Sequence, residues 1–504
     1  MKTLTSFFFR FKKPIFLSIL FCFAVFIRLP QINGVNFLPD SDECVLGVMG
    51  NHLSKGQNFP TFFYGQTYGF STLEAVLVAG GIYCWGITAA AIKLPMLLLY
   101  LFCLWALFAF IEKKSGVFIA FLLVFLFAAE PSWLTWAMKA RGGYLTALLL
   151  GFVLIYRWQQ QSSSSLQWLL NGFLLGLLFH CHLFWFIGWF PAAVYYQRKI
   201  SPKDKRISLF STSITMALIW LVGLLQPEFW SLPQSVWHGI PEWTFFYENF
   251  KTFLSGHFHY SVTIGLPYGT IIATKLWILV HLFSLVLLGI LFYQKKTNPE
   301  ILLWLFISLL LLLIPVFNYN EKIHFRYWLP FSAAFIVFLA HLTWAFKPSK
   351  RHIQITAVLV VFIGFWAYRA GKDIVKLDPY QDLFTHLDEN RETELKRFAN
   401  LLVEEQSNLV FCTDSRLMWL LNFYSDGKVF TRFIYNIDRY LPDVQKVNNN
   451  FLEKRQATLI GFSKIPPPRE KLMSTDTIRV VDAHFFILKK VDQKTLQNLG
   501  FRFD

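Results

Sequence analysis

The sequence predicts a mainly α-helical fold, a polytopic bundle of transmembrane helices that carries a small α/β domain at its C-terminal end. The 504 residues are 55% hydrophobic and only 15% charged, whereas an average soluble domain has about 25% charged residues. Apolar segments of near-spanning length recur up to about residue 370, and after this point the composition becomes that of an ordinary polar domain. We therefore expect a membrane domain at 1–370 and a separate domain at 371–504.

The membrane domain is predicted from apolar segments that lie at roughly 15–29, 71–88, 92–111, 116–129, 143–157, 166–179, 183–196, 207–225, 275–293, 300–316, 327–346 and 353–369. Several of them are shorter than the ~20 residues that a straight span needs. We expect these to extend into amphipathic flanks such as 131–137, which gives about 11 net spans.

The formal net charge of +16 is concentrated in short loops between the apolar segments. The basic residues of these loops are Lys2, Arg10, Lys12, Lys13, Lys113, Lys114, Arg198, Lys199, Lys203, Lys205, Arg206, Lys295, Lys296, Lys347, Lys350 and Arg351. Lys and Arg collect in cytoplasmic loops and suit anionic membrane lipids. The pattern thus argues against nucleic acid as a partner and predicts a cytoplasmic N-terminus.

The same orientation places the loop 30–70, the stretches 130–142, 226–274 and 317–326, and the C-terminal domain outside. Two apolar segments separate the loop 30–70 from the cytoplasmic Lys113 and Lys114, and an even number of spans cannot join opposite sides. One of the two is therefore re-entrant, broken or interfacial, and 71–88, which contains Gly80 and Gly81, is the better candidate.

The domain at 371–504 shows short β-like runs separated by amphipathic helical patterns. The β-like runs are Leu409–Cys412, Thr458–Ile460, Ile478–Val481 and Phe485–Leu488, and the helical patterns lie at about 391–405 and 439–454. Strands that alternate with helices are typical of an α/β domain. The domain contains neither a glycine-rich phosphate loop nor a set of Cys and His at metal-ligand spacing.

The acidic run Asp40-Ser41-Asp42-Glu43 follows the first apolar segment and precedes a run that is compatible with a helix. Asp40 and Glu43 stand three residues apart at a helix start, so they can form a capping box. Asp42 would interact favourably with the helix dipole but has no essential structural partner. Asp42 is therefore the best candidate for a catalytic base.

The outer loop continues with polar side chains set among aromatic ones at 59–69, and then with Leu73-Glu74-Ala75. Hydrogen-bonding groups beside an apolar wall suit a sugar, and the substrate-binding candidates of this region are Asp40, Tyr64, Gln66, Tyr68 and Glu74. An interfacial aromatic belt is the alternative interpretation, and it fits the Phe residues best.

These motifs resemble the opening of bacterial GT-C integral-membrane glycosyltransferases, relatives of the lipid A aminoarabinose and protein O-mannosyl transferases. The resemblance is carried by Asp42-Glu43 with Gly47 and Met49, Phe-Phe-Tyr-Gly-Gln-x-Tyr-Gly at 62–69 and Leu-Glu-Ala at 73–75, and more weakly by Arg141-Gly142-Gly143-Tyr144, by Arg326-Tyr327-Trp328-Leu329-Pro330 and by Arg439-Tyr440-Leu441-Pro442. It implies inverting transfer of a sugar from a polyprenyl-phosphate donor to a lipid, glycan or protein acceptor. It also implies a catalytic carboxylate at Asp42, with Glu43 adjacent, and a periplasmic active site on a bacterial inner membrane.

Such chemistry needs a base for the acceptor hydroxyl and cations for the departing phosphate. The cationic candidates expected on the outer face are Lys139, Arg141, His324 and Arg326, because guanidinium groups bind phosphate bidentately. Tyr327 is a further substrate-binding candidate beside Arg326. The alternative for Arg326 is a long side chain that snorkels at a helix end.

A divalent metal stays open as a cofactor. The spacings His180-x-His182 and His257-x-His259 could bind a metal, although a His pair at a helix end is more often an interfacial polar pair. A transporter or flippase of lipid-linked saccharides is the main rival function. Such proteins place ionisable residues near the bilayer midplane, whereas here the charges gather at the outer edge. A non-catalytic assembly partner is a third interpretation.

Overall fold

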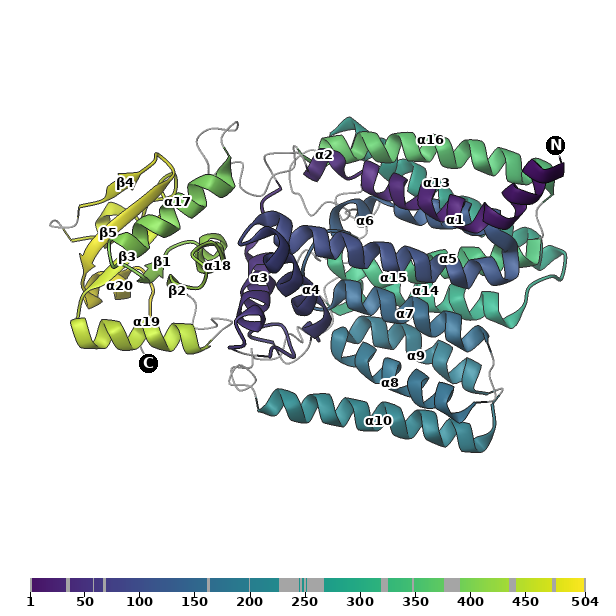
Figure 1. Cartoon of the computed structure of the whole chain (residues 1–504), viewed down its shortest axis with the longest axis horizontal. Coiled ribbons are helices and arrows are strands. Elements are labelled where there is room, and N and C mark those ends of the chain that lie inside the picture. Colours follow the sequence, from purple (N-terminus) through teal and green to yellow (C-terminus); the bar gives the residue numbers. More distant parts are fainter. Residues whose placement is uncertain are drawn as a thin grey trace.

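The computed structural model describes residues 2–32, 37–57, 59–66, 69–160, 164–198, 200–225, 244, 247–248, 251, 267–318, 325–346, 349–375, 390–434, 441–473 and 477–502. Figure 1 shows a bundle of long helices with a smaller, sheet-containing domain at one end. The N-terminus lies at the opposite end of the bundle from this domain.

The bundle helices correspond closely to the apolar segments that the sequence predicted. They are α1 (Lys2–Phe26), α5 (Ala89–Ala128), α7 (Tyr144–Gln159), α8 (Ser165–Cys181), α9 (Leu183–Gln197), α10 (Pro202–Leu224), α13 (Tyr268–Tyr293), α14 (Pro299–Asn318), α15 (Leu329–Phe346) and α16 (Lys350–Ile374), with the short α2 (Leu29–Ile32), α6 (Pro131–Trp136) and η2 (Phe325–Trp328) between them. Within the described ranges, five helices are long and apolar enough to cross a membrane, and several apolar helices are shorter. The total of about 11 spans stays a prediction.

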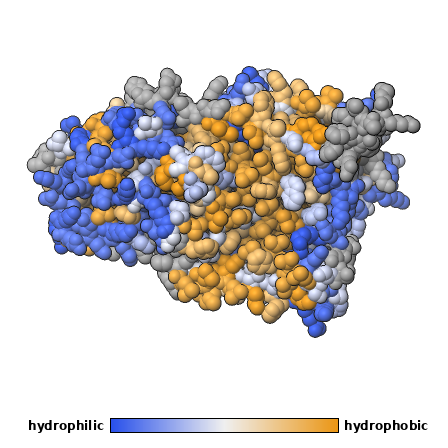
Figure 2. All heavy atoms as spheres, in the orientation of Figure 1, coloured by the Kyte–Doolittle hydropathy of each residue, from blue (hydrophilic) through white to orange (hydrophobic). Residues whose placement is uncertain are grey.

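The bundle exposes large apolar side chains over much of its surface, as Figure 2 shows in orange. Leu218 of α10, Phe283 of α13 and Val361 of α16 are 56%, 69% and 69% exposed. Contiguous apolar surface of this kind is unfavourable in water and matches the requirement of lipid-facing helices. The chain is therefore a multi-pass integral membrane protein, and its C-terminal domain is largely hydrophilic in the same view.

The long α5 contains two of the predicted spans, joined at Gly116, whose φ of 80° is outside the helical region. Arg28 lies over the ring of Tyr100, before this glycine, and its Nη2 donates to the carbonyl of Ala128, after it. A straight helix would separate Tyr100 from Ala128 by roughly 40 Å. The chain therefore turns back at Gly116, and the two halves of α5 run antiparallel.

Two helices of the outer loop, α3 (Ser41–Ser54) and α4 (Thr72–Trp85), lie across the direction of the long helices, at the end of the bundle next to the C-terminal domain (Figure 1). The 14 residues of α4 are fewer than the ~20 of a straight span. That 71–88 is re-entrant, broken or interfacial stays a prediction. A Cβ at Gly81 would collide with the carbonyl of Ala91, so the glycine lets α4 pack tightly on the start of α5.

The C-terminal domain contains a five-stranded sheet in the order β2-β1-β3-β5-β4. Its strands are β1 (Leu409–Cys412), β2 (Phe430–Phe433), β3 (Ala457–Phe462), β4 (Arg479–Val481) and β5 (Phe485–Val491), and its helices are α17 (Arg391–Glu404), α18 (Ser415–Tyr424), α19 (Leu441–Lys454) and α20 (Gln493–Asn498), with the short η3 (Arg469–Lys471). The pairs β1–β2 and β1–β3 are parallel, whereas β3–β5 and β4–β5 are antiparallel. The predicted small C-terminal sheet with helices is present.

Helix α3 is attached to the C-terminal domain along its length. At its start, Ser41 Oγ donates to the carbonyl of Ser415 at 2.9 Å. Just after its end, Lys55 Nζ pairs with Asp426 Oδ1 at 2.7 Å. Between them, Gly47 has no side chain and so lets a ring of α18 lie against the α3 backbone. The outer loop and the C-terminal domain therefore form one continuous structure at this end of the bundle.

Candidate active site

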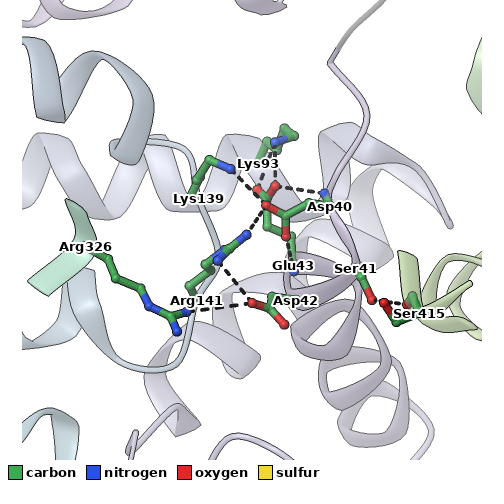
Figure 3. A network of polar contacts seen from close by, with 9 residues as sticks. All are labelled: Asp40, Ser41, Asp42, Glu43, Lys93, Lys139, Arg141, Arg326 and Ser415. Atoms are coloured by element: carbon green, nitrogen blue, oxygen red, sulfur yellow. Dashed lines mark hydrogen bonds and ion pairs between the residues drawn. The ribbon is translucent and has the colours of Figure 1, made fainter. Parts of the chain in front are cut away.

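The acidic run folds as the capping box that the sequence allowed, at the N-terminus of α3. Asp40 Oδ1 accepts from the backbone N–H of Glu43 at 3.0 Å. The backbone N–H of Asp40 in turn donates to Glu43 Oε2 at 3.0 Å. This reciprocal pair satisfies two helix-end donors. It also places Asp42 in the first turn of α3, with its carboxylate directed away from the cap (Figure 3).

Glu43 has a second partner that the sequence did not suggest. Lys93 of α5 donates from Nζ to Glu43 Oε1 at 2.8 Å and to Oε2 at 3.1 Å. The two side chains are only 1% and 10% exposed, so a buried ion pair joins α3 to α5. Both carboxylate oxygens of Glu43 therefore accept hydrogen bonds from other groups of the protein. The sequence contained one indication of this ion pair. Lys93 lies within an apolar segment, and a buried ammonium group requires a partner.

Asp40 holds the first pair of cations. Lys139 Nζ lies 2.9 Å from Asp40 Oδ2, and Arg141 Nη2 contacts the same oxygen. Burial raises the pKa of Asp40, but the charges of Arg141 and Lys139 lower it more, so that the pKa lies well below its usual range. Asp40 is therefore a fixed anion that positions the segment between α6 and α7.

Asp42 lies beside two guanidinium groups that come from different elements (Figure 3). Its Oδ2 is 3.1 Å from Arg141 Nη1 and 3.9 Å from Arg326 Nη1, which belongs to η2. All three side chains are between 21% and 27% exposed, so a ligand can reach them. The structure thus brings together the predicted base and two of the predicted phosphate ligands.

Both guanidinium groups retain unused hydrogen-bonding capacity. Within the described ranges, the buried Nε of Arg141 and that of Arg326 have no hydrogen-bond acceptor. Arg326 otherwise donates to the hydroxyl of Tyr327 at 3.3 Å and lies 5.1 Å from the centroid of that ring. Buried donors without acceptors are unfavourable unless a ligand supplies an acceptor. The arrangement therefore suits an anion with several oxygens.

Glu74 has a different position from the one expected of a substrate ligand. Its carboxylate is fully buried and accepts from the backbone N–H of Gly143 at 3.1 Å and from the backbone N–H and hydroxyl of Thr146 at 3.2 and 3.1 Å. Gly143, the N-cap of α7, has no side chain with which to cap this helix. Glu74 performs the capping from α4 and so fixes the chain two residues after Arg141.

The remaining candidates of the outer loop differ in how far they are buried. Tyr64 is buried, with 1% of its surface exposed, and its hydroxyl lies 2.8 Å from His52 Nδ1 of α3. Gln66 is half-buried beside the turn of the same loop. Tyr68 and His324 lie outside the described residues.

The two histidine pairs give no metal site in the described part of the chain. His180 Nε2 contacts the carbonyl of Met216 at 2.8 Å, whereas His182 Nε2 contacts the hydroxyl of Tyr144 at 3.0 Å. The two rings therefore have separate partners, as an interfacial polar pair does. His257 and His259 lie outside the described residues. Among the residues that are described, no three His, Cys, Asp or Glu side chains form a group that could hold a metal ion.

The fold is similar to solved structures of two kinds of glycosyltransferase. The structure of ArnT from Cupriavidus metallidurans bound to undecaprenyl phosphate matches with a TM-score of 0.59 at 11% identity, over 95% of this chain and 98% of that one. The apo state of the same protein gives 0.60 at 12% identity, with the same coverage. An Archaeoglobus fulgidus oligosaccharyltransferase, in complex with zinc and sulfate, gives 0.52 at 12% identity, over 89% of this chain and 68% of that one.

Both kinds of protein are GT-C glycosyltransferases, so the resemblance that the outer-loop motifs predicted is confirmed at the level of the fold. No protein-family model matches the chain, and no curated protein matches it in sequence.

Proposed function

We propose that this chain with a GT-C fold is a glycosyltransferase, which moves a sugar from a polyprenyl-phosphate donor to a lipid, glycan or protein acceptor. The observation that carries the proposal is the partly exposed carboxylate of Asp42 beside the guanidinium groups of Arg141 and Arg326. The undecaprenyl phosphate bound to the similar ArnT structure supports the class of donor.

In the proposed reaction, Asp42 takes the proton of the acceptor hydroxyl as that oxygen attacks the anomeric carbon of the sugar. The bond between this carbon and the phosphate oxygen breaks on the opposite face, so the anomeric configuration inverts. The electron pair leaves with polyprenyl phosphate. Arg141 and Arg326 stabilise the charge that develops on this leaving group, through charge-assisted hydrogen bonds.

The neighbouring candidates support this site without contacting the reacting atoms. Asp40 holds Lys139 and Arg141, Glu43 ties α3 to α5 through Lys93, and Glu74 caps α7. We assign positioning roles to these three carboxylates.

We place the reaction on the non-cytoplasmic face of the membrane, with a bacterial inner membrane as the expected location. The basic residues Lys13 and Lys114 pair with Glu112 and Glu300 at 2.6 and 3.3 Å. Lys114 lies just before the turn of α5 at Gly116 and is roughly 30 Å along this helix from Lys93, the partner of Glu43. Since basic loops remain cytoplasmic, the C-terminal domain and the site of Asp42 face the other side.

A transfer assay with the purified protein tests the proposal. Radiolabelled polyprenyl-phosphate sugars are supplied in detergent with a membrane glycolipid extract, and both free polyprenyl phosphate and labelled acceptor are measured. We expect the two products in equal amounts. The flippase function would be supported instead if intact lipid-linked sugar crosses proteoliposomes with its glycosidic bond unbroken. Neither transfer nor transport from any donor would support an assembly partner.

A further inference from the structure

A cavity lies about ten residues along α3 from Asp42, where the end of α3 meets the C-terminal domain. It has a volume of about 270 Å³ and is lined by residues of α3, of the α18–β2 loop and of α19. This volume is close to the lower limit of roughly 300–1,000 Å³ for small-molecule pockets. Asn51 and His52 of α3 and Asp443 of α19 are among its lining residues.

Asp443 is the least expected residue of this cavity. Its side chain is only 2% exposed. One oxygen, Oδ2, accepts from Asn422 Nδ2 at 2.8 Å. The other, Oδ1, has no hydrogen-bond donor in the described part of the chain, and Lys446 Nζ is 3.7 Å away. A buried carboxylate oxygen without a donor destabilises the fold, which indicates that a ligand supplies the donor.

Asn51 provides a second buried polar group. It is 2% exposed and lines the cavity together with Asp443. An amide offers both a donor and an acceptor. The cavity therefore presents a carboxylate and an amide, a combination that suits vicinal hydroxyl groups.

The charges around the cavity indicate a neutral ligand. Lys55 pairs with Asp426 at 2.7 Å, and Lys446 lies near Asp443 while its Nζ also covers the ring of Phe430 at 4.0 Å. The two ammonium groups thus balance the two carboxylates. A phosphate or a free carboxylate would find no surplus positive charge here, unlike at the site of Asp42.

We propose that this cavity binds a neutral saccharide, the part of a glycan acceptor that lies away from the reacting hydroxyl. The assignment to the acceptor rests on the proposed function, whereas saccharide binding does not. The rise of an α-helix separates Asp42 from His52 by roughly 15 Å, so the donor sugar, which must reach Asp42, cannot occupy this cavity at the same time. His52 also contacts Tyr64 of the outer loop at 2.8 Å, which links the cavity to the predicted substrate-binding loop.

Binding should depend on pH through Asp443. The charged or titratable groups that line the cavity with it are Lys446 on its own helix, His52 and Lys55 at the end of α3, and Asp426 in the α18–β2 loop. Burial raises the pKa of Asp443 to about 6, although Lys446 and Asn422 lower it in part. Burial lowers the pKa of His52 to about 4. Affinity should therefore decline as the pH falls from 7 to 5, while His52 stays neutral.

The test is the binding of a panel of neutral oligosaccharides, from two to four sugars long, to the full-length purified protein. We expect wild type to bind at least one of them, and Asp443→Asn to bind it roughly 10- to 100-fold more weakly, because a hydrogen bond to a charged group is lost. Lys446→Gln, at a side chain that is 53% exposed and therefore tolerant, should weaken binding less. Asp482→Asn, at an exposed position of the same domain, is the matched control and should bind normally.

Further variants separate this inference from the proposed function. Asp42→Asn should bind the oligosaccharide as wild type does, even though its rate of sugar transfer is strongly reduced. Binding without any transfer by wild type would contradict the proposed function alone. No binding of the panel by folded wild type, or equal binding by Asp443→Asn, would overturn the saccharide site. Unchanged KM for a glycan acceptor in Asp443→Asn, despite lost saccharide binding, would overturn its assignment to the acceptor.

Discussion

Asp40, Asp42 and Glu43 lie within one helical turn but have three different surroundings. Asp40 contacts Lys139 and Arg141, and Glu43 is buried against Lys93. Asp42 is the most exposed of the three, with 23% of its side chain exposed against 14% for Asp40 and 1% for Glu43, and it also has cationic neighbours. All three residues are carboxylates. Asp42 is the proposed base because of its neighbours and its exposure, and not because of its residue type.

The guanidinium group of Arg141 contacts two carboxylates at the same time. Its guanidinium reaches Asp40 through Nη2 and Asp42 through Nη1, which the single ammonium of a lysine cannot do. Arg141→Lys should keep Asp40 paired and the protein folded, but lower the rate of transfer roughly 10- to 100-fold. The measurement is kcat with a saturating polyprenyl-phosphate sugar.

The matched control for this variant is Arg416→Lys, because Arg416 pairs with Asp414 at 2.6 Å and its side chain is 41% exposed. Transfer by the control should equal that of wild type. If Arg141→Lys is as active as the control, the simultaneous contact of the Arg141 guanidinium with Asp40 and Asp42 has no part in the reaction.

Sequence reasoning at the residue scale identified the acidic run and its cationic neighbours, and the structure brings Asp42, Lys139, Arg141 and Arg326 into one site. It could separate Asp42 from the capping pair because capping follows a local spacing. It could not find the partner of Glu43, since Lys93 is 50 residues away and only tertiary packing brings the two together. For the same reason Glu74 appeared as a substrate ligand, whereas it caps α7.

At the scale of elements, the position of α3 depends on its buried ion pair with α5. Glu43→Gln preserves the capping box, because Gln can also serve at this position, but leaves Lys93 buried without a counter-charge. We expect a loss of about 3–5 kcal/mol in stability, seen as a fall of several degrees in the melting temperature in detergent.

The double variant Glu43→Gln with Lys93→Met removes the unpaired charge and should recover most of the lost stability, since an apolar replacement of a buried pair is often tolerated. Additive losses in this double-mutant comparison would mean that the two side chains do not stabilise each other.

The elements themselves were largely predictable. Apolar periodicity located the long helices and the strands β1, β3, β4 and β5, although α1 begins 13 residues and α13 7 residues before the predicted segments at 15–29 and 275–293. It missed β2. This strand has only four residues, and one of them is the buried and charged Arg432, so its sequence does not show the apolar pattern of a buried strand. It also missed α18, a short and almost continuously apolar helix, because the period of such a short run does not distinguish a helix from a strand. The available signal was Asp414, whose side chain caps this helix.

For the whole molecule, the central expectation is its orientation in the membrane. Val480, on β4 of the C-terminal domain, is 57% exposed, and Lys113 is exposed at the turn of α5. With the exposed Cys22 and Cys84 replaced by serine, a membrane-impermeant maleimide should label Val480→Cys in spheroplasts, and Lys113→Cys only after permeabilisation. The opposite pattern would place the site of Asp42 on the cytoplasmic side.

Hydropathy alone predicted a mainly helical membrane protein, and the change to a polar composition predicted a small C-terminal sheet with helices; both are present. Sequence reasoning could not foresee that α3 packs against both parts, or that a cavity with Asp443 forms between them. Such contacts join positions almost 400 residues apart, and no local pattern encodes them.

The rate of sugar transfer by Asp42→Asn tests the central claim most directly. The variant keeps the size of the side chain but cannot accept the proton of an acceptor hydroxyl. At equal amounts of folded protein, and with the binding of polyprenyl phosphate retained, kcat should fall about 10²–10⁴-fold. Transfer at the wild-type rate would mean that Asp42 is not the base.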